Sequence, residues 1–114
     1  MTQRLQRRLA AIVAMDVAGF SRLVGHDEEG TLTALSLHRA ELTDPLIAEF
    51  GGRIANTAGD SILAEFSSAV EAVRCAVAIQ EGMDKRNQPV PTHLQLWFRI
   101  GVNVGDVVAN GNDL

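Results

Sequence analysis

The fold is decided by one stretch of the chain, residues 53–66, which reads RIANTAGDSILAEF. Two runs suited to β-strands, residues 53–58 and 61–66, are separated here by only Gly59 and Asp60. A two-residue connection between such runs predicts a β-hairpin, and glycine in the first loop position suits a type II′ turn. Asp60 is therefore expected at the tip of a hairpin.

Before the hairpin, the sequence predicts one strand and a long helical region. Residues 9–15 are continuously apolar, and a short run of this kind indicates a buried strand. Residues 20–50 carry leucines at helical spacing, with a break or kink expected near Asp44-Pro45. Gly51-Gly52 is expected to end that helix.

After the hairpin, the sequence predicts a second helix and a last strand. Ser68 and Glu71 form a capping box that opens the helix, which is expected to end near Gly82. The apolar spacing predicts a core stripe made of Val70, Val73, Ala76, Val77 and Ile79. Residues 94–104 alternate between apolar and polar side chains, as in a strand with one buried face.

The order of these elements predicts an α+β fold with the β-α-β-β-α-β arrangement of ferredoxin-like domains. In that topology the third strand lies antiparallel beside the first, so the end of the first strand and the start of the third share one edge. Asp16, which directly follows the first strand, is therefore expected to face Asp60. Two carboxylates held close together repel each other, and a bound divalent cation relieves that repulsion.

The turn after the first strand adds a candidate anion site. Gly19 lets the chain turn tightly, and the amides of Gly19, Phe20 and Ser21 can then point at an anion. A carboxylate followed by such a turn is typical of sites for a metal ion and a triphosphate. The residues alone also allow simpler roles, Asp16 as a helix N-cap and Asp60 as an ordinary turn residue.

Length and charge favour a single soluble domain without nucleic-acid partners. The chain has 114 residues, of which 46% are hydrophobic, and a net charge of -4. Its basic residues cluster only in residues 1–8, a short lead before a domain of residues 9–114, so no stripe suited to nucleic acid is visible. The apolar run that follows the lead is too short to span a bilayer and lacks a signal cleavage site, which predicts a cytoplasmic protein away from membranes.

The other reactive side chains predict no further site. Cys75 is the single cysteine and is expected to be a reduced, buried thiol. His26, His38 and His93 stand at no spacing typical of zinc ligands and are expected at the surface. Asp106 is expected to be a turn residue.

Four segments together resemble the catalytic domain of class III adenylate/guanylate cyclases. They are residues 9–23, 51–66, 73–77 and 99–108, and they cover nearly the whole chain in order. Several linked motifs at suitable spacing make the resemblance specific. It implies conversion of ATP or GTP to a 3′,5′-cyclic nucleotide and pyrophosphate for signalling, in a homodimer whose sites lie at the subunit interface.

The resemblance also implies roles for single residues. Asp16 and Asp60 would hold two Mg²⁺ or Mn²⁺ ions, and the carbonyl of Val17 would complete one of these metal sites. One ion would lower the pKa of the ribose 3′-hydroxyl for in-line attack, and the other would steady the leaving pyrophosphate. The triphosphate would be held by the turn made of Ala18, Gly19, Phe20 and Ser21.

Two features depart from the family pattern. Asn56 stands where adenine-specific members commonly have lysine and guanine-specific members have an acid. Its amide can both donate and accept, so Asn56 does not settle the choice of base and is either a base contact or a polar filler of its strand. For the domain as a whole, ATP is expected as the substrate rather than GTP. The family also continues past Asn112-Asp113-Leu114 into a segment with a second base-reading residue and with the asparagine and arginine that stabilise the transition state. The chain is therefore expected to be incomplete and inactive by itself.

Two alternatives stay open at this point. One is a degenerate cyclase-like domain that binds nucleotide or dimerises without turnover, and the other is a ferredoxin-like regulatory module without metal. An aspartyl-phosphatase role for Asp16 is excluded, because Ala18 stands where that chemistry needs a second acid.

Overall fold

The computed structural model describes residues 6–109, and the side chains of residues 8–106. A π-helical turn, Arg39–Thr43, and a 3-10 turn, Thr92–Leu94, accompany the main elements. In chain order these are β1 (Gln6–Val17), α1 (Phe20–His26), α2 (Glu28–His38), α3 (Asp44–Glu49), β2 (Gly52–Ala58), β3 (Ser61–Phe66), α4 (Ala69–Asn87) and β4 (Phe98–Ala109).

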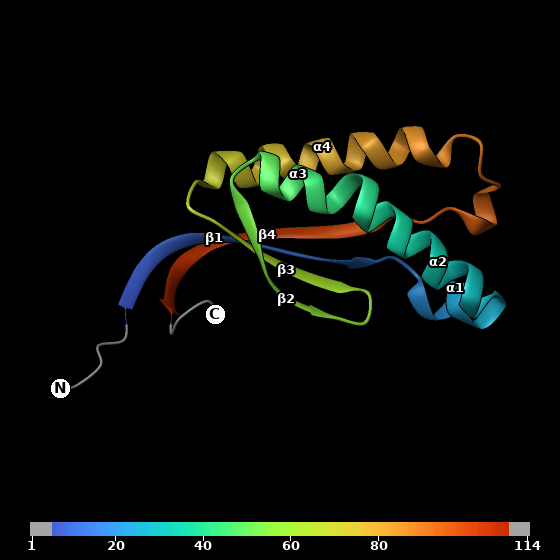
Figure 1. Ribbon diagram of the computed structural model, residues 1–114, viewed down its shortest axis with the longest axis horizontal. Helices are drawn as coiled ribbons and strands as arrows, with labels where there is room; N and C mark the ends of the chain where they lie inside the picture. The colour runs from blue at the N-terminus through green and yellow to red at the C-terminus, as the bar shows by residue number, and fades with distance from the viewer. Residues whose placement is uncertain (1–5, 110–114) are drawn as a thin grey trace.

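The strands form one antiparallel sheet in the order β2-β3-β1-β4. The helices lie together on one side of this sheet and leave its other side open (Figure 1). Because β3 lies between β1 and β2, the α+β prediction with ferredoxin-like topology is confirmed. Met15 near the end of β1 lies opposite Ile62 near the start of β3, so those two strand ends share one edge as expected.

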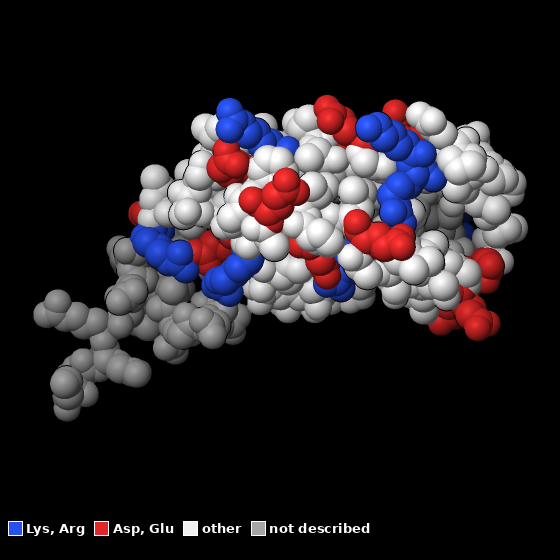
Figure 2. Space-filling model, turned by 45° about the horizontal axis from the view of Figure 1, so that its top comes forward, with Lys and Arg blue, Asp and Glu red and all other residues white. Residues whose placement is uncertain are grey.

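Alternation along β1 sorts its side chains between the two faces of the sheet. Val13, Met15 and Val17 point toward the helices and are buried in the core. Ala14 and Asp16 therefore point to the open face. Figure 2, with the helix side turned forward, shows acidic and basic side chains interspersed rather than gathered by sign.

The hairpin has the predicted turn. Gly59 has a φ of 58°, and no non-glycine residue among those described has a positive φ, so Asp60 does not. A positive φ at the first loop residue alone is the pattern of a type II′ turn.

The helical region of residues 20–50 is broken in two places. Asp27 ends α1 and caps α2, where its side chain accepts a hydrogen bond of 3.0 Å from the Gly30 amide. The second break, expected near Asp44-Pro45, takes the form of the π-helical turn that directly precedes α3. Pro45 has no N–H to donate to the preceding turn, and a local change of helical register accommodates that loss.

The predicted core stripe of α4 is wrong for its three valines, whereas Ile79 is buried and Ala76 is half-buried. The buried apolar residues are Ala72, Cys75, Ile79 and Met83, whereas Val70, Val73 and Val77 are 60%, 51% and 51% exposed. The helix therefore has two adjacent apolar stripes. The stripe that packs against the sheet is the one that begins with the small side chains of Ala72 and Cys75. The helix also continues past Gly82 to Asn87.

Two strand boundaries also differ from the prediction. β1 begins at Gln6 rather than at residue 9, because its first residues pair with the end of β4. β4 begins at Phe98, since the preceding residues form the 3-10 turn, and it runs to Ala109. Asp106 accordingly lies within a strand, opposite Leu9, and is not a turn residue. The other residues of the basic lead, 1–5, lie outside the described part.

Candidate functional site

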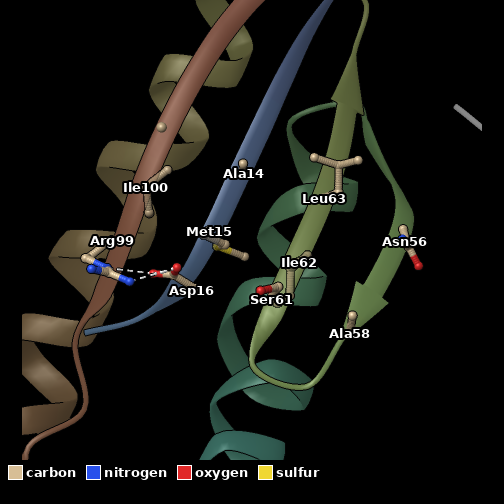
Figure 3. A pocket seen from close by; sticks show the side chains of 11 residues that line it. Ala14, Met15, Asp16, Asn56, Ala58, Ser61, Ile62, Leu63, Arg99 and Ile100 are labelled. Carbon is tan, nitrogen blue, oxygen red and sulfur yellow. Dashed lines mark hydrogen bonds and ion pairs between the residues drawn. The ribbon is translucent and has the colours of Figure 1, made fainter. Parts of the chain in front are cut away.

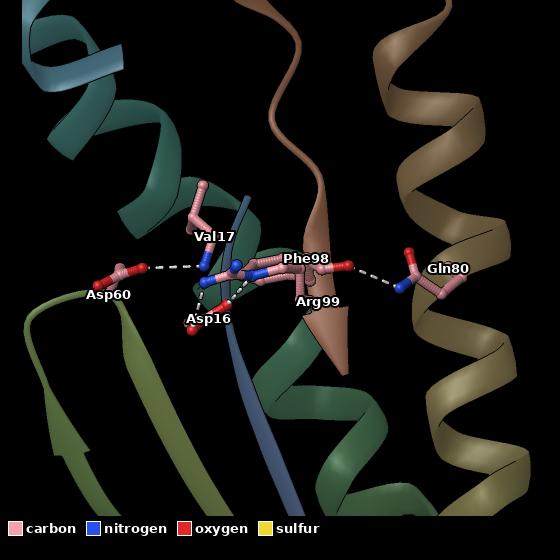
Figure 4. Close-up of polar contacts among 6 residues, drawn as sticks. All are labelled: Asp16, Val17, Asp60, Gln80, Phe98 and Arg99. Carbon is pink, nitrogen blue, oxygen red and sulfur yellow. Dashed lines mark hydrogen bonds and ion pairs between the residues drawn. The ribbon is translucent and has the colours of Figure 1, made fainter. Parts of the chain in front are cut away.

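Asp16 and Asp60 converge at one end of the open sheet. Asp16 is the next-to-last residue of β1, and Asp60 lies in the loop between β2 and β3. The carboxylate of Asp60 extends from this loop to the end of β1, where it accepts a hydrogen bond of 2.9 Å from the main-chain N–H of Val17 (Figure 4). The hairpin tip is therefore fastened to the residue next to Asp16.

The structure contradicts the simpler role for Asp16 and leaves that for Asp60 in place, because Asp60 does lie in the turn of the hairpin. The N-cap of α1 is Gly19, in the left-handed conformation and without a side-chain cap, so Asp16 does not cap this helix. The Asp60 carboxylate also accepts a hydrogen bond from Val17, 43 positions away along the sequence and outside the hairpin turn.

Arg99 forms a third charged group at this end of the sheet. It lies opposite Asp16 where β4 pairs with β1. Its Nε and Nη2 donate hydrogen bonds of 2.8 and 2.9 Å to the two carboxylate oxygens of Asp16 (Figure 4). These hydrogen bonds hold the pKa of Asp16 below its usual value, and they raise the pKa of Arg99, to which the negative charge of Asp60 also contributes.

The charged groups surround a cavity of about 340 Å³. Its wall combines the two carboxylates and Arg99 with the turn that leads into α1. The lining residues are Asp16, Val17, Gly19, Phe20, Ser21, Asp60 and Arg99. Six of the seven residues predicted for the metal ions and the triphosphate are thus brought together.

Ala18 is the predicted residue that does not line this cavity. Its N–H donates a hydrogen bond of 2.8 Å to the carbonyl of Trp97, so that amide is turned toward the loop before β4. In contrast, the amides of Phe20 and Ser21 belong to the first turn of α1, and such amides have no acceptor within their own helix.

Asn56 lines a second cavity, of about 420 Å³, on the open face of the sheet. This cavity shares Asp16 and Arg99 with the first, and the small residues Ala14 and Ala58 help to line it (Figure 3). Gly101 is a further small residue of the lining. The two cavities therefore meet at the Asp16–Arg99 pair.

A β-bulge aims Asn56 at this cavity. Strict alternation along β2 predicts that Asn56 shares a face with both Ile54 and Ala58, but the register with β3 shifts between Ile54 and Asn56. Ile54 consequently packs against the core, whereas Asn56 and Ala58 line the open-face cavity. Bulges of this kind re-aim a side chain next to a functional site.

Comparison with known proteins identifies the domain, although no family model matches the chain. The protein named "Putative adenylate cyclase 3" of Rhizobium meliloti (strain 1021) is 42% identical over 112 residues, which are 98% of this chain and 19% of that protein. The crystal structure of an adenylate/guanylate cyclase/hydrolase from Silicibacter pomeroyi is 44% identical, with a TM-score of 0.89 over 96% of this chain. The chain belongs to the class III adenylate/guanylate cyclase family.

Other relatives are similar to this chain over only part of their own length. The structure of the guanylyl cyclase Cya2 is 30% identical, with a TM-score of 0.78, over 91% of this chain and 57% of the solved chain. The serine/threonine-protein kinase pkn2 of Myxococcus xanthus is 31% identical over 101 residues, 86% of this chain but 12% of the kinase. This chain also spans 64% of the solved Silicibacter chain, so it matches only a part of each relative.

The contact of Arg99 with Asp16 in this cyclase domain was not among the expectations from the sequence. The signal was present in the topology, because β4 lies antiparallel beside β1, so the end of β1 and the start of β4 lie at the same edge. Matching the last residues of β1 with the first residues of β4 puts Arg99 opposite Asp16. The length of the loop before β4 was the missing information.

The remaining reactive residues lie away from the cyclase site. Cys75 is fully buried in α4, and burial raises the pKa of its thiol to about 11, as expected of a structural cysteine. His38 is not a surface residue, since it is half-buried and accepts a hydrogen bond of 2.8 Å from Nε of Arg86. His26 and His93, expected apart, meet edge to face with ring centroids 6.0 Å apart. No helix in the described part of the chain is long and apolar enough to cross a bilayer.

Proposed function

We propose that this domain forms a 3′,5′-cyclic nucleotide and pyrophosphate from a nucleoside triphosphate, with ATP favoured over GTP and two divalent ions as cofactors. The observation that carries the proposal is the cavity in which Asp16, Asp60 and Val17 adjoin the turn of residues 19–21. In this reaction the ribose 3′ oxygen forms a bond to the α-phosphorus while the bond to the pyrophosphate oxygen breaks. The cytoplasm, where nucleoside triphosphates are available, is the proposed location.

The donor atoms at this cavity fit Mg²⁺ or Mn²⁺. Asp16 and Asp60 offer carboxylate oxygens and Val17 offers a main-chain carbonyl, and these hard ligands suit both ions. With one guanidinium beside two carboxylates, the lining of the cavity has an excess of negative charge. When bound, the ions supply Lewis acidity toward the 3′-hydroxyl and neutralise charge on the triphosphate.

The other lining residues suit the remaining parts of a nucleotide. The first-turn amides of Phe20 and Ser21 can donate to phosphate oxygens at the positive end of α1. Asn56 faces the adjoining cavity of about 420 Å³, where its amide can donate to and accept from a purine edge. The two cavities meet at Asp16 and Arg99.

We further propose that turnover requires a homodimer of longer chains. The two carboxylates and Arg99 can bind metal and anion, but the described lining of the cavity offers no further charged group to stabilise the transition state. The 114-residue chain alone should therefore bind metal without measurable turnover. Loss of one positioned donor typically lowers a rate by a factor of about 10²–10³.

Calorimetric titration with Mn²⁺ and a cyclase assay together test the proposal. Asp16→Asn keeps the shape of the side chain but removes its charge, so Mn²⁺ binding should weaken about tenfold or more. In a protein with the complete domain, the same substitution should abolish formation of the cyclic nucleotide. Unchanged Mn²⁺ binding in both Asp16→Asn and Asp60→Asn would reject the metal site.

A second candidate function is a domain that binds nucleotide or dimerises without turnover. The similarity to a segment of the Myxococcus xanthus kinase favours it, because there the cyclase-like stretch is a small part of a protein named for another activity. Nucleotide binding without product from the complete domain, with Mn²⁺ present, would support this candidate over catalysis.

A further inference from the structure

We propose that Arg99 is a built-in counter-cation, which holds Asp16 while the site is free of metal and must release this carboxylate when a divalent ion binds. This inference rests on the metal site proposed above. It adds that Arg99 competes with the metal ion for the carboxylate of Asp16. Arg99 would thus set how tightly the first ion binds.

The first support is the geometry of the pair. Nε and Nη2 of Arg99 each donate to a different oxygen of Asp16, at 2.8 and 2.9 Å. A side-on pair of this kind uses the planar fork of the guanidinium, which matches the two oxygens of a carboxylate. Both ligand oxygens of Asp16 are therefore already engaged by a cation.

The second support is the charge that a metal ion would meet. Each oxygen of Asp16 keeps another lone pair, but an ion bound there would lie beside the positive charge of Arg99. Asp60 lines the same cavity as Asp16 and Arg99, so an ion bound by both aspartates would lie close to this guanidinium. A divalent ion that binds both aspartates thus competes with Arg99 directly.

The third support is that Arg99 can leave without disturbing the fold. Its side chain is 69% exposed, whereas its main chain is fixed by the pairing of β4 with β1. Next to it, the carbonyl of Phe98 accepts a hydrogen bond of 2.8 Å from Nε2 of Gln80 in α4 (Figure 4). The long side chain can therefore turn away while its Cα stays in place.

The size of the effect follows from the exposure of the pair. A competitor lowers the apparent affinity by the fraction of Asp16 that is free to bind. Ion pairs as exposed as this one, with side chains 69% and 37% accessible, have modest strength and shift such an equilibrium by up to about fivefold. Removing Arg99 should therefore tighten binding of the first metal ion about fivefold.

Mn²⁺ binding in the absence of nucleotide tests this directly, read by the electron paramagnetic resonance signal of free Mn²⁺. The variants are Arg99→Gln, Arg99→Lys and Arg22→Gln, each checked for folding by circular dichroism. Arg22→Gln is the matched control, because Arg22 bonds to the carbonyl of His93 and its loss removes a positive charge without freeing Asp16. We expect about fivefold tighter binding for Arg99→Gln, an intermediate value for Arg99→Lys and a change within about twofold for Arg22→Gln.

A second measurement uses the unmodified chain. Titration with Mg²⁺, followed by ¹H–¹⁵N spectra of the arginine Nε–H groups, should shift the Arg99 signal with the same midpoint as metal binding. The Nε–H of Arg86, which donates to His38, should not move and is the internal control.

The outcomes separate this inference from the metal site itself. If Arg99→Gln binds Mn²⁺ no more tightly than the unmodified chain, while Asp16→Asn binds it about tenfold or more weakly, the metal site is supported and the competition by Arg99 is rejected. An unmoved Arg99 signal at saturating Mg²⁺ would overturn it too. Absence of binding in both the unmodified chain and Arg99→Gln would reject the metal site and the competition together.

Discussion

The main-chain N–H of Val17 donates a hydrogen bond of 2.9 Å to Oδ2 of Asp60, which fastens the tip of the β2–β3 hairpin to the end of β1. Asp60 thus has a structural role, which is to accept this hydrogen bond, in addition to the metal-binding role proposed for its carboxylate. The two roles predict different results for two substitutions at the same position.

Asp60→Asn should separate stability from metal binding. Its amide oxygen can still accept from Val17, so the free energy of unfolding should stay near that of the unmodified chain, whereas Asp60→Ala should lose about 1–2 kcal/mol. Both variants should lose Mn²⁺ binding. Urea unfolding and calorimetry measure the two effects, with Asp84→Ala as a control that removes an exposed carboxylate from α4. Equal stability loss in both Asp60 variants would contradict the structural role.

Asn87 is predicted to hold the start of β4 in place. It is 2% exposed, and its amide donates to the carbonyl of Leu96 at 2.8 Å and accepts from the Leu96 N–H at 3.1 Å. Asn87→Ala would leave both main-chain groups of Leu96 buried without partners, which should cost about 3 kcal/mol in urea unfolding. Gln88→Ala, at an exposed neighbouring position, should cost less than about 0.5 kcal/mol. A similar loss in the two variants would argue against this role.

Cys75 should be inert toward thiol reagents in the folded chain. With its pKa raised to about 11, only about one thiol in a thousand is a thiolate at pH 8, and the side chain is fully buried. Labelling by a disulfide reagent should therefore be at least about 100-fold slower than in the urea-unfolded chain. Rapid labelling under native conditions would show that α4 opens readily.

The hairpin and the meeting of the two aspartates could be predicted because both depend on short-range signals. The Gly59-Asp60 pair specifies the turn, and the order of the elements then sets which strand ends meet. In contrast, the position of Asn56 depends on a bulge that no local pattern marks. The pairing of Arg99 with Asp16 depends on where β4 begins after an irregular loop. Such information lies in tertiary packing rather than in residue spacing.

Dependence on tertiary packing also explains why the wrong face of α4 was predicted to be buried. Val70, Val73 and Val77 form a regular apolar stripe, and periodicity favours this stripe as strongly as the one containing Cys75 and Ile79. The shape of the sheet beneath the helix makes the choice, and that shape is not encoded within the helix.

Stability should fall as the solution becomes mildly acidic, partly through His38. Burial and the charge of Arg86 lower its pKa from the usual 6.5, and the charge of Glu41 opposes this only in part. Below about pH 6.5 the unfolded chain binds a proton that the folded chain does not, so this contribution is complete above that pH and is lost as pH falls toward the folded pKa. Urea unfolding of His38→Gln should depend less steeply on pH between 7.5 and 5 than that of the unmodified chain, and parallel curves would remove His38 as a cause.

Asn56 should give loose discrimination between ATP and GTP in a protein that carries the complete domain. Its amide both donates and accepts, so it can meet either purine, and it lacks the charge that would reject the wrong one. In Asn56→Lys the ammonium only donates, which disfavours the N1–H group that guanine has and adenine lacks, so the preference should move toward ATP. Competition between the two nucleotides in a cyclase assay measures this shift, and Mn²⁺ affinity should stay the same. Asn103→Lys is the control, because Asn103 lies opposite Ile12 and outside the cavity of Asn56. An unaltered preference in Asn56→Lys would assign Asn56 to strand packing and leave the choice of base to other residues.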